Sequence, residues 1–164
     1  MIYSPFKKII SGGQTGVDRA ALDVAIEMGI PHGGWCPAGR RSEDGSIAPI
    51  YQLQETSTRN YAQRTEKNVL DSCGTLILYR NCITGGTALT KRLTRAHAQP
   101  CLCIDLGPSL FDATSILAAL IDWGTKHQVE ILNVAGPRAS TQPEIYSLAY
   151  SFLNIALTKT ARPQ

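Results

Sequence analysis

Two glycine-rich loops hold the residues of this chain whose types and spacing best suit chemistry. The first contains Gly12, Gly13, Gln14, Thr15 and Gly16, and the second contains Gly85, Gly86 and Thr87. Glycine lets the backbone approach a ligand closely, and a helix that begins after such a loop offers unpaired N–H groups and a positive dipole end. Each loop therefore predicts an anion site, although a tight turn with the threonine as an ordinary N-cap would give the same pattern.

Arginines near these loops would supply positive charge for such an anion. Arg138 follows a predicted apolar strand directly, and Arg40 follows a second short strand. Guanidinium groups match phosphate better than ammonium groups do. Arg138 is the stronger candidate because ligands gather where buried strands end, while a solvated surface role remains open for both. Trp35 could stack on a planar heterocycle or simply pack under the loop that follows it.

Familiar nucleotide and metal motifs do not occur in the sequence. The glycines of the first loop do not form G-x-G-x-x-G, and there is no G-x-x-x-x-G-K-[ST], which argues against NAD chemistry and P-loop ATP hydrolysis. The three histidines are isolated and the five cysteines form no Cys-x-x-Cys pair, so we expect no metal site. Glu43 and Asp44 are expected to be solvated, and we assign no catalytic residue.

Alternating apolar strands and amphipathic helices must position these loops. Strands are expected at residues 7–11, 33–36, 51–55, 75–79, 101–106 and 130–134, and helices at 15–28, 59–71 and 116–123 and after Gly85 and Thr141. Strands that are apolar throughout are buried on both faces. The pattern predicts a single Rossmann-like α/β domain over residues 1–164, a three-layer doubly wound parallel sheet of order 3-2-1-4-5 with an extra strand. In that order the two glycine loops flank the reversal of strand order, where ligands bind.

Composition limits the classes of partner. Hydrophobic residues make up 43% of the chain and charged residues 18%, which excludes whole-chain disorder. A net charge of +3 suits a small anionic ligand better than a nucleic acid. Neither a secretory signal nor an apolar stretch of about 20 residues is present, so we expect a cytoplasmic protein with reduced thiols and no membrane partner. We also expect a homo-oligomer.

Five segments resemble the family of putative molybdenum cofactor carriers. They are residues 12–23, 33–45, 64–69, 85–87 and 132–138, in the family's order and over nearly the whole domain. That family is similar to a larger Rossmann-like group, which includes the cytokinin-activating phosphoribohydrolases and DNA-processing proteins. The resemblance implies binding of the molybdenum cofactor, a phosphorylated molybdopterin, without a required reaction. It also implies molybdoenzymes or cofactor-biosynthesis proteins as partners.

The chain departs from its relatives at three positions. Cys73 and Ala139 stand where the carrier family has acidic residues, and Thr90 stands where the phosphoribohydrolases have a glutamate. Because cleavage of an N-glycosidic bond needs such a carboxylate, the last departure favours a carrier over an enzyme. Two alternatives stay open. One is a nucleotide 5'-monophosphate phosphoribohydrolase that uses Arg64 and Glu66, and the other is a nucleotide-sensing or single-strand-binding module.

Overall fold

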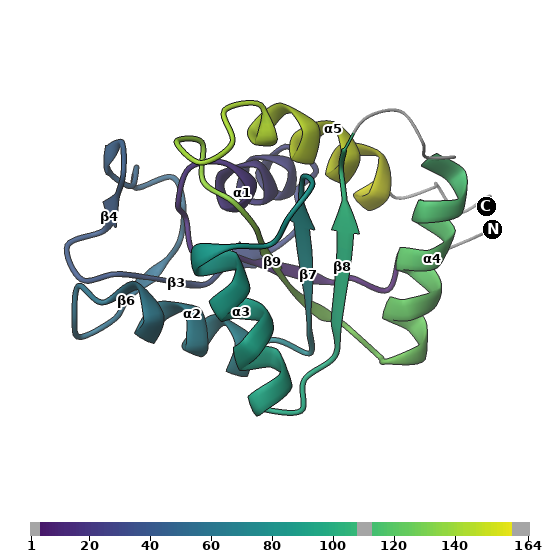
Figure 1. Cartoon of the computed structure of the whole chain (residues 1–164), viewed down its shortest axis with the longest axis horizontal. Helices are drawn as coiled ribbons and strands as arrows, with labels where there is room; N and C mark the ends of the chain where they lie inside the picture. The colour runs from purple at the N-terminus through teal and green to yellow at the C-terminus, as the bar shows by residue number, and fades with distance from the viewer. Residues whose placement is uncertain (1–3, 108–112, 159–164) are drawn as a thin grey trace.

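A five-stranded parallel sheet forms the centre of the molecule in the computed structural model, which describes residues 4–107 and 113–158 (Figure 1). Its strands are β1 (Lys8–Ile10), β2 (His32–Gly33), β7 (Gly74–Tyr79), β8 (Cys101–Asp105) and β9 (Ile131–Ala135). All neighbouring strands run parallel. The continuous burial of β7 explains why its sequence is apolar without alternation. The predicted α/β class is confirmed.

The order of the strands corrects the sequence prediction at two places. The third predicted strand, near residues 51–55, lies outside this sheet, in a separate two-stranded sheet. The sheet reads β2-β1-β9-β7-β8, so the expected neighbours β2 and β1, and likewise β7 and β8, do pair. The first and fourth predicted strands, β1 and β7, do not pair, because the extra strand β9 lies between them and pairs with both. Consecutive strands usually lie side by side, and nothing local in the sequence announces this exception. If the count starts at β9, the five strands follow the doubly wound order 3-2-1-4-5.

Helices cover the two faces of this sheet unequally. One face carries α1 (Val17–Glu27), α4 (Ala113–Lys126) and α5 (Ile145–Leu157), which share one apolar core with alternate residues of β7 and β9. The other carries α2 (Tyr61–Leu70) and α3 (Gly85–Ala96), which contact each other; α3 lies in front of the sheet in Figure 1. The buried residues of α3 are Thr87, Thr90 and Thr94, so this second face is comparatively polar.

The long irregular stretch between the second strand and α2 has more structure than the sequence predicts. Chain direction changes at Gly34, where an added Cβ would lie 2.1 Å from the Ser11 carbonyl oxygen. After it, β3 (Trp35–Cys36) pairs with β6 (Gln54–Glu55), the short strand expected near residues 51–55. A hairpin of β4 (Arg41–Ser42) and β5 (Gly45–Ser46), which was not predicted, projects between them.

The final helix, α5, begins later than the sequence predicts after Thr141. The helix begins at Ile145 with Glu144 as N-cap, and no side chain caps it. Residues before it form a turn in which the N–H groups of Thr141 and Gln142 donate to the Arg138 carbonyl, over 3.1 and 3.0 Å. None of the helices in residues 4–107 and 113–158 is long and apolar enough to cross a membrane.

Candidate functional site

A cavity of about 330 Å³ lies beyond the carboxyl ends of the central strands, on the polar side of the sheet. Its walls come from the loops after β1 and β9, from α2 and from the beginning of α3. Six of the ten predicted ligand-binding residues line it: Gly12, Gln14, Gly85, Gly86, Thr87 and Arg138. The other four, Gly13, Thr15, Gly16 and Arg40, do not. Ligand contact itself stays a prediction for all ten.

The beginning of α3 opens directly into this cavity. Its N-cap, Thr84, forms no side-chain capping bond, and no hydrogen bond from the N–H groups of Gly85, Gly86 or Thr87 reaches a described residue. A Cβ added at either glycine would meet nothing within 4 Å. This helix end therefore combines free donors, open space and a positive dipole end, which are the features that bind a phosphate or another anion.

The loop that precedes α1 is closed by contrast. The Gln14 N–H donates to Asp18 Oδ2 over 3.3 Å, and the Val17 N–H donates to the Pro137 carbonyl over 3.2 Å. Gly16 has a φ of +80°, and a Cβ there would lie 2.3 Å from the same Pro137 oxygen. Gly16 therefore lets this loop pack against the segment after β9, and the N–H groups of Gln14 and Val17 are already used within the protein.

A buried ion pair joins α1 to α2 inside the cavity. Arg64 Nη1 lies 2.9 Å from Asp18 Oδ2, and the two side chains are 15% and 6% exposed. The pair covers Gly12, where an added Cβ would lie 1.3 Å from Arg64 Nη1. Burial raises the pKa of the Asp18 carboxyl, and the guanidinium beside it opposes that rise. Arg64 Nε is buried without a partner among the described residues.

Arg138 is half-exposed at the mouth of the cavity, close to the β4–β5 hairpin. Its Nε lies 3.7 Å from Glu43 Oε2, and its side chain is 51% exposed. Glu43 is exposed, as the sequence suggests, and it also accepts hydrogen bonds from Thr15 Oγ1 and from the N–H and hydroxyl of Ser140. Glu43 therefore brings a carboxylate next to Ser140, the residue that follows Ala139.

Arg40 forms hydrogen bonds within its own loop. Its guanidinium donates to four backbone carbonyls over 2.8–3.3 Å, those of Ile47, Ala48, Tyr51 and Leu53. These bonds hold the irregular segment before β6 together. Arg40 thus lies outside the cavity, with its donors directed to the backbone, whereas Arg64, which the sequence suggested only for a phosphoribohydrolase, lines the cavity.

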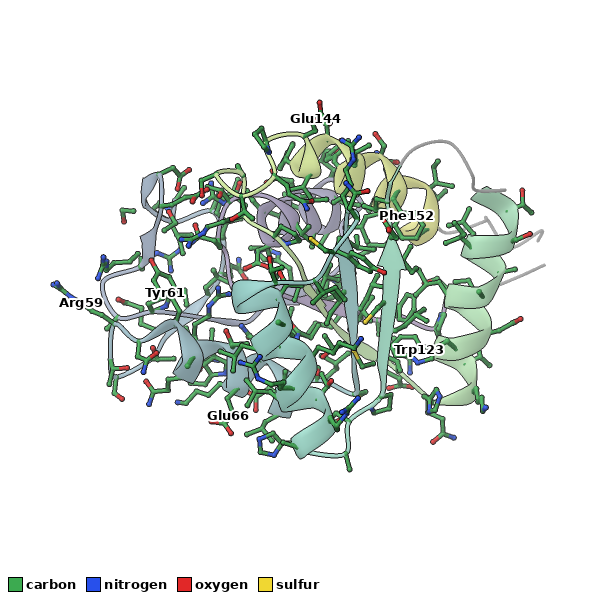
Figure 2. All side chains as sticks on the ribbon, viewed as in Figure 1. Arg59, Tyr61, Glu66, Trp123, Glu144 and Phe152 are labelled. Atoms are coloured by element: carbon green, nitrogen blue, oxygen red, sulfur yellow. The ribbon has the colours of Figure 1, made fainter. Side chains whose placement is uncertain are left out.

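Four further residues lie where the sequence could not place them. Trp35 is outside the cavity, donates from Nε1 to Asp71 over 2.7 Å and carries Lys67 Nζ 3.9 Å above its ring. Tyr61 is the aromatic residue that lines the cavity. Glu66 contacts His97 Nε2 over 2.8 Å, and Figure 2 shows it leaving α2 on a different side from Tyr61. Cys73 precedes β7 and so lies at the opposite end of the sheet from the cavity.

Asp18 is the functional candidate that the sequence reasoning missed, although a signal for it exists. Asp18 stands at helical spacing with Ala21, Leu22 and Ala25, all of which are buried on α1. A carboxylate on the buried face of an amphipathic helix is unusual and indicates a partner or a site. No comparable signal marks Tyr61, which begins a helix of mixed polar character.

Comparisons with known proteins agree with this architecture. The family model of the circularly permutated YpsA SLOG family matches residues 9–157. A solved structure of a putative molybdenum carrier protein from Syntrophus aciditrophicus is 47% identical, with a TM-score of 0.90 over 95% of this chain and 98% of that one. The comparison with curated proteins gave no match. The permuted topology agrees with a doubly wound order that starts at β9. The chain therefore belongs to the circularly permutated YpsA branch of the SLOG family, and its similarity to molybdenum carriers is confirmed.

Proposed function

We propose that this protein is a molybdenum cofactor carrier, which binds phosphorylated molybdopterin in the cavity at the carboxyl ends of the strands. The observation that carries the proposal is the uncapped start of α3, whose three free N–H groups face the same cavity as the buried guanidinium of Arg64. The 47% identical relative bears the name of a molybdenum carrier, which supports this class of ligand.

The cavity has the parts that such a ligand requires. Its phosphate would accept hydrogen bonds from the N–H groups of Gly85, Gly86 and Thr87, with Arg64 and Arg138 neutralising its charge. The charged residues that line the cavity within the described chain are two arginines and one aspartate, so the net charge of the lining is positive. A volume of about 330 Å³ lies within the range of small-ligand pockets. A carrier needs nothing further, and it would pass its cargo to a molybdoenzyme or a cofactor-biosynthesis protein.

Native mass spectrometry of protein taken directly from molybdenum-replete cells tests the proposal. We expect a bound species with the mass of a phosphorylated pterin, lost on denaturation. The same purification of the Gly86→Glu variant is the control, because a carboxylate at the start of α3 repels an anion while leaving the rest of the cavity in place. Protein that carries only nucleotides, or a pterin that persists in the variant, would contradict the proposed site.

One observation favours a nucleotide phosphoribohydrolase as a second candidate. Asp18 provides a carboxylate in the cavity, whereas Glu66, which the sequence suggested for that role, contacts His97 outside it. Incubation with nucleoside 5'-monophosphates separates the two functions. A hydrolase releases free base, and its activity disappears in Asp18→Asn; a carrier releases none.

A further inference from the structure

One oxygen of the Asp18 carboxylate is not used by the fold. Asp18 is 4% exposed and lines the cavity. Its Oδ2 accepts two hydrogen bonds, from Arg64 Nη1 at 2.9 Å and from the Gln14 N–H at 3.3 Å. Its Oδ1 accepts none from the residues that the structure describes. Oδ1 is not one of the fully enclosed side-chain atoms that lack a partner in the described chain, so it keeps some exposure and can accept a hydrogen bond from a donor that a ligand brings.

The same cavity offers a surface for a flat ring. Tyr61 lines it from α2, while Leu89 from α3 and Val134 from β9 add apolar contact. Aromatic and aliphatic side chains around a few well-placed polar groups are typical of sites that bind heterocycles. With the free N–H groups of α3 and Asp18 Oδ1, the cavity is complementary to a molecule that has an anionic group, a planar ring and N–H donors on that ring.

We propose that Asp18 determines ligand specificity by accepting hydrogen bonds from a 2-amino-4-oxopyrimidine ring, the edge that pterins and guanine share. The ring N–H and the exocyclic amino group are adjacent donors on that edge, and the carboxylate Oδ1 is an acceptor only. The inference rests on the proposed function, because it assumes that the phosphate of the same ligand lies at α3. A ring with oxygen in place of the amino group would face the carboxylate with an acceptor and be rejected.

The bonding of Oδ2 predicts what Asp18→Asn does. Because Arg64 Nη1 and the Gln14 N–H both donate to Oδ2, the asparagine amide keeps its oxygen at that position. Its NH₂ group then replaces Oδ1 and converts an acceptor into a donor. The preference for a 2-amino ring over a 2-oxo ring should therefore reverse, which a merely structural role of Asp18 would not produce.

Calorimetric titrations with molybdopterin, guanosine monophosphate, xanthosine monophosphate and inorganic phosphate test this proposal. We expect the wild type to bind the guanine nucleotide at least about tenfold more tightly than the xanthine nucleotide. The 2-amino group of guanine can donate a hydrogen bond to the charged Asp18 carboxylate, and the 2-oxo group of xanthine cannot. Asp18→Asn should reverse that order and keep its affinity for phosphate. Glu66→Gln, the same change on α2 outside the cavity, should keep the wild-type order.

The outcomes separate the inference from the function on which it rests. Wild-type protein that binds molybdopterin but does not distinguish the two nucleotides overturns the role of Asp18 and leaves the carrier function standing. Wild-type protein that binds none of the probes overturns both. The wild-type comparison decides the matter even if Asp18→Asn fails to fold.

Discussion

The two glycine loops share a sequence pattern, yet the structure uses them in opposite ways. The loop before α1 is closed: Gly16 lets it pack against the segment after β9, and the N–H groups of Gln14 and Val17 donate to Asp18 and to the Pro137 carbonyl. The loop before α3 is open: nothing lies within 4 Å of a Cβ built at Gly85 or Gly86, and the first N–H groups of the helix have no described partner.

This difference shows that a glycine pair before a helix does not by itself mean ligand binding. A glycine is required where the backbone has a positive φ, as at Gly16 and Gly85, or where a neighbouring chain segment or a ligand comes too close for a side chain. A substitution damages the fold in the first two cases, and it damages binding in the last. The comparison is therefore testable loop by loop.

The largest expected effect on stability is at Gly16. Alanine there must adopt a φ of +80° and would place its Cβ 2.3 Å from the Pro137 carbonyl oxygen. We expect Gly16→Ala to lower the free energy of unfolding by at least about 2 kcal/mol. Gly86→Ala is the matched control, because its Cβ enters open space in a helix, and its stability should lie within about 1 kcal/mol of the wild type. Chemical denaturation measures both, and equal losses would contradict the distinction between the loops.

The next effect is on binding, at Gly86. Glutamate at this position adds bulk and a negative charge where an anion is proposed to bind, and close like charges in a cleft cost several kcal/mol. We expect Gly86→Glu to weaken molybdopterin binding about 100-fold or more. Its thermal midpoint should change little, since Gly86 needs no positive φ and a carboxylate suits a helix N-terminus. Gly86→Gln separates bulk from charge, and wild-type affinity in a folded Gly86→Glu variant would remove α3 from the site.

Some features of the fold can be predicted from the sequence and others cannot. The α/β class follows from apolar strands and amphipathic helices, because periodicity reports burial directly. The position of β9 in the sheet cannot be predicted from the sequence. The apolar residues Leu132 and Val134 show only that the strand is buried and not which strands it pairs with. Pairing is decided by contacts between segments far apart in the chain, and a permuted order leaves no local trace.

The candidate site likewise has parts that the sequence predicts and parts that it does not. Its loops could be located from the rule that ligands bind at the carboxyl ends of parallel strands, which needs only the positions of the strands. The role of Arg40 could not be foreseen, because its partners are backbone carbonyls of an irregular loop. Arg64 and Asp18 are 46 positions apart in the chain and lie on two different helices. The only sign of their pairing in the sequence is that Asp18 stands on the buried face of its helix.

A smaller effect on binding is expected at Arg138, which extends the comparison to the mouth of the cavity. Its side chain is half-exposed and lies 3.7 Å from a Glu43 oxygen, so it is less desolvated than Arg64. We expect Arg138→Ala to weaken phosphate or molybdopterin binding about tenfold, as for one charge-assisted hydrogen bond, and to change stability by less than about 1 kcal/mol. Arg41→Ala, an exposed arginine on the nearby hairpin, is the calorimetric control. An equal loss in both variants would indicate a diffuse charge effect instead of a contact.

The smallest expected effect is on the pH dependence of stability, at Glu43. Its carboxylate links the β4–β5 hairpin to the loop before α1 by accepting a hydrogen bond from Thr15. Burial raises the pKa of Glu43, but hydrogen bonds from Ser140 and Thr15 outweigh it and leave the pKa below its usual value near 4.5. The native state therefore holds this proton less tightly than the unfolded chain does. The resulting stability is present above about pH 4.5 and is lost as the pH falls through the lowered pKa.

Glu43→Gln should remove this acid-dependent contribution, so the difference in unfolding free energy between wild type and variant should shrink as the pH falls from 7 to 3. Denaturation curves at a series of pH values measure it. Glu130→Gln, which changes an exposed carboxylate paired with Lys7, is the control for general effects of lost charge. A difference for Glu43→Gln that is the same at pH 7 and pH 3 would show that Glu43 does not hold the hairpin through its ionised form. The closed loop would then owe its shape to glycine packing alone.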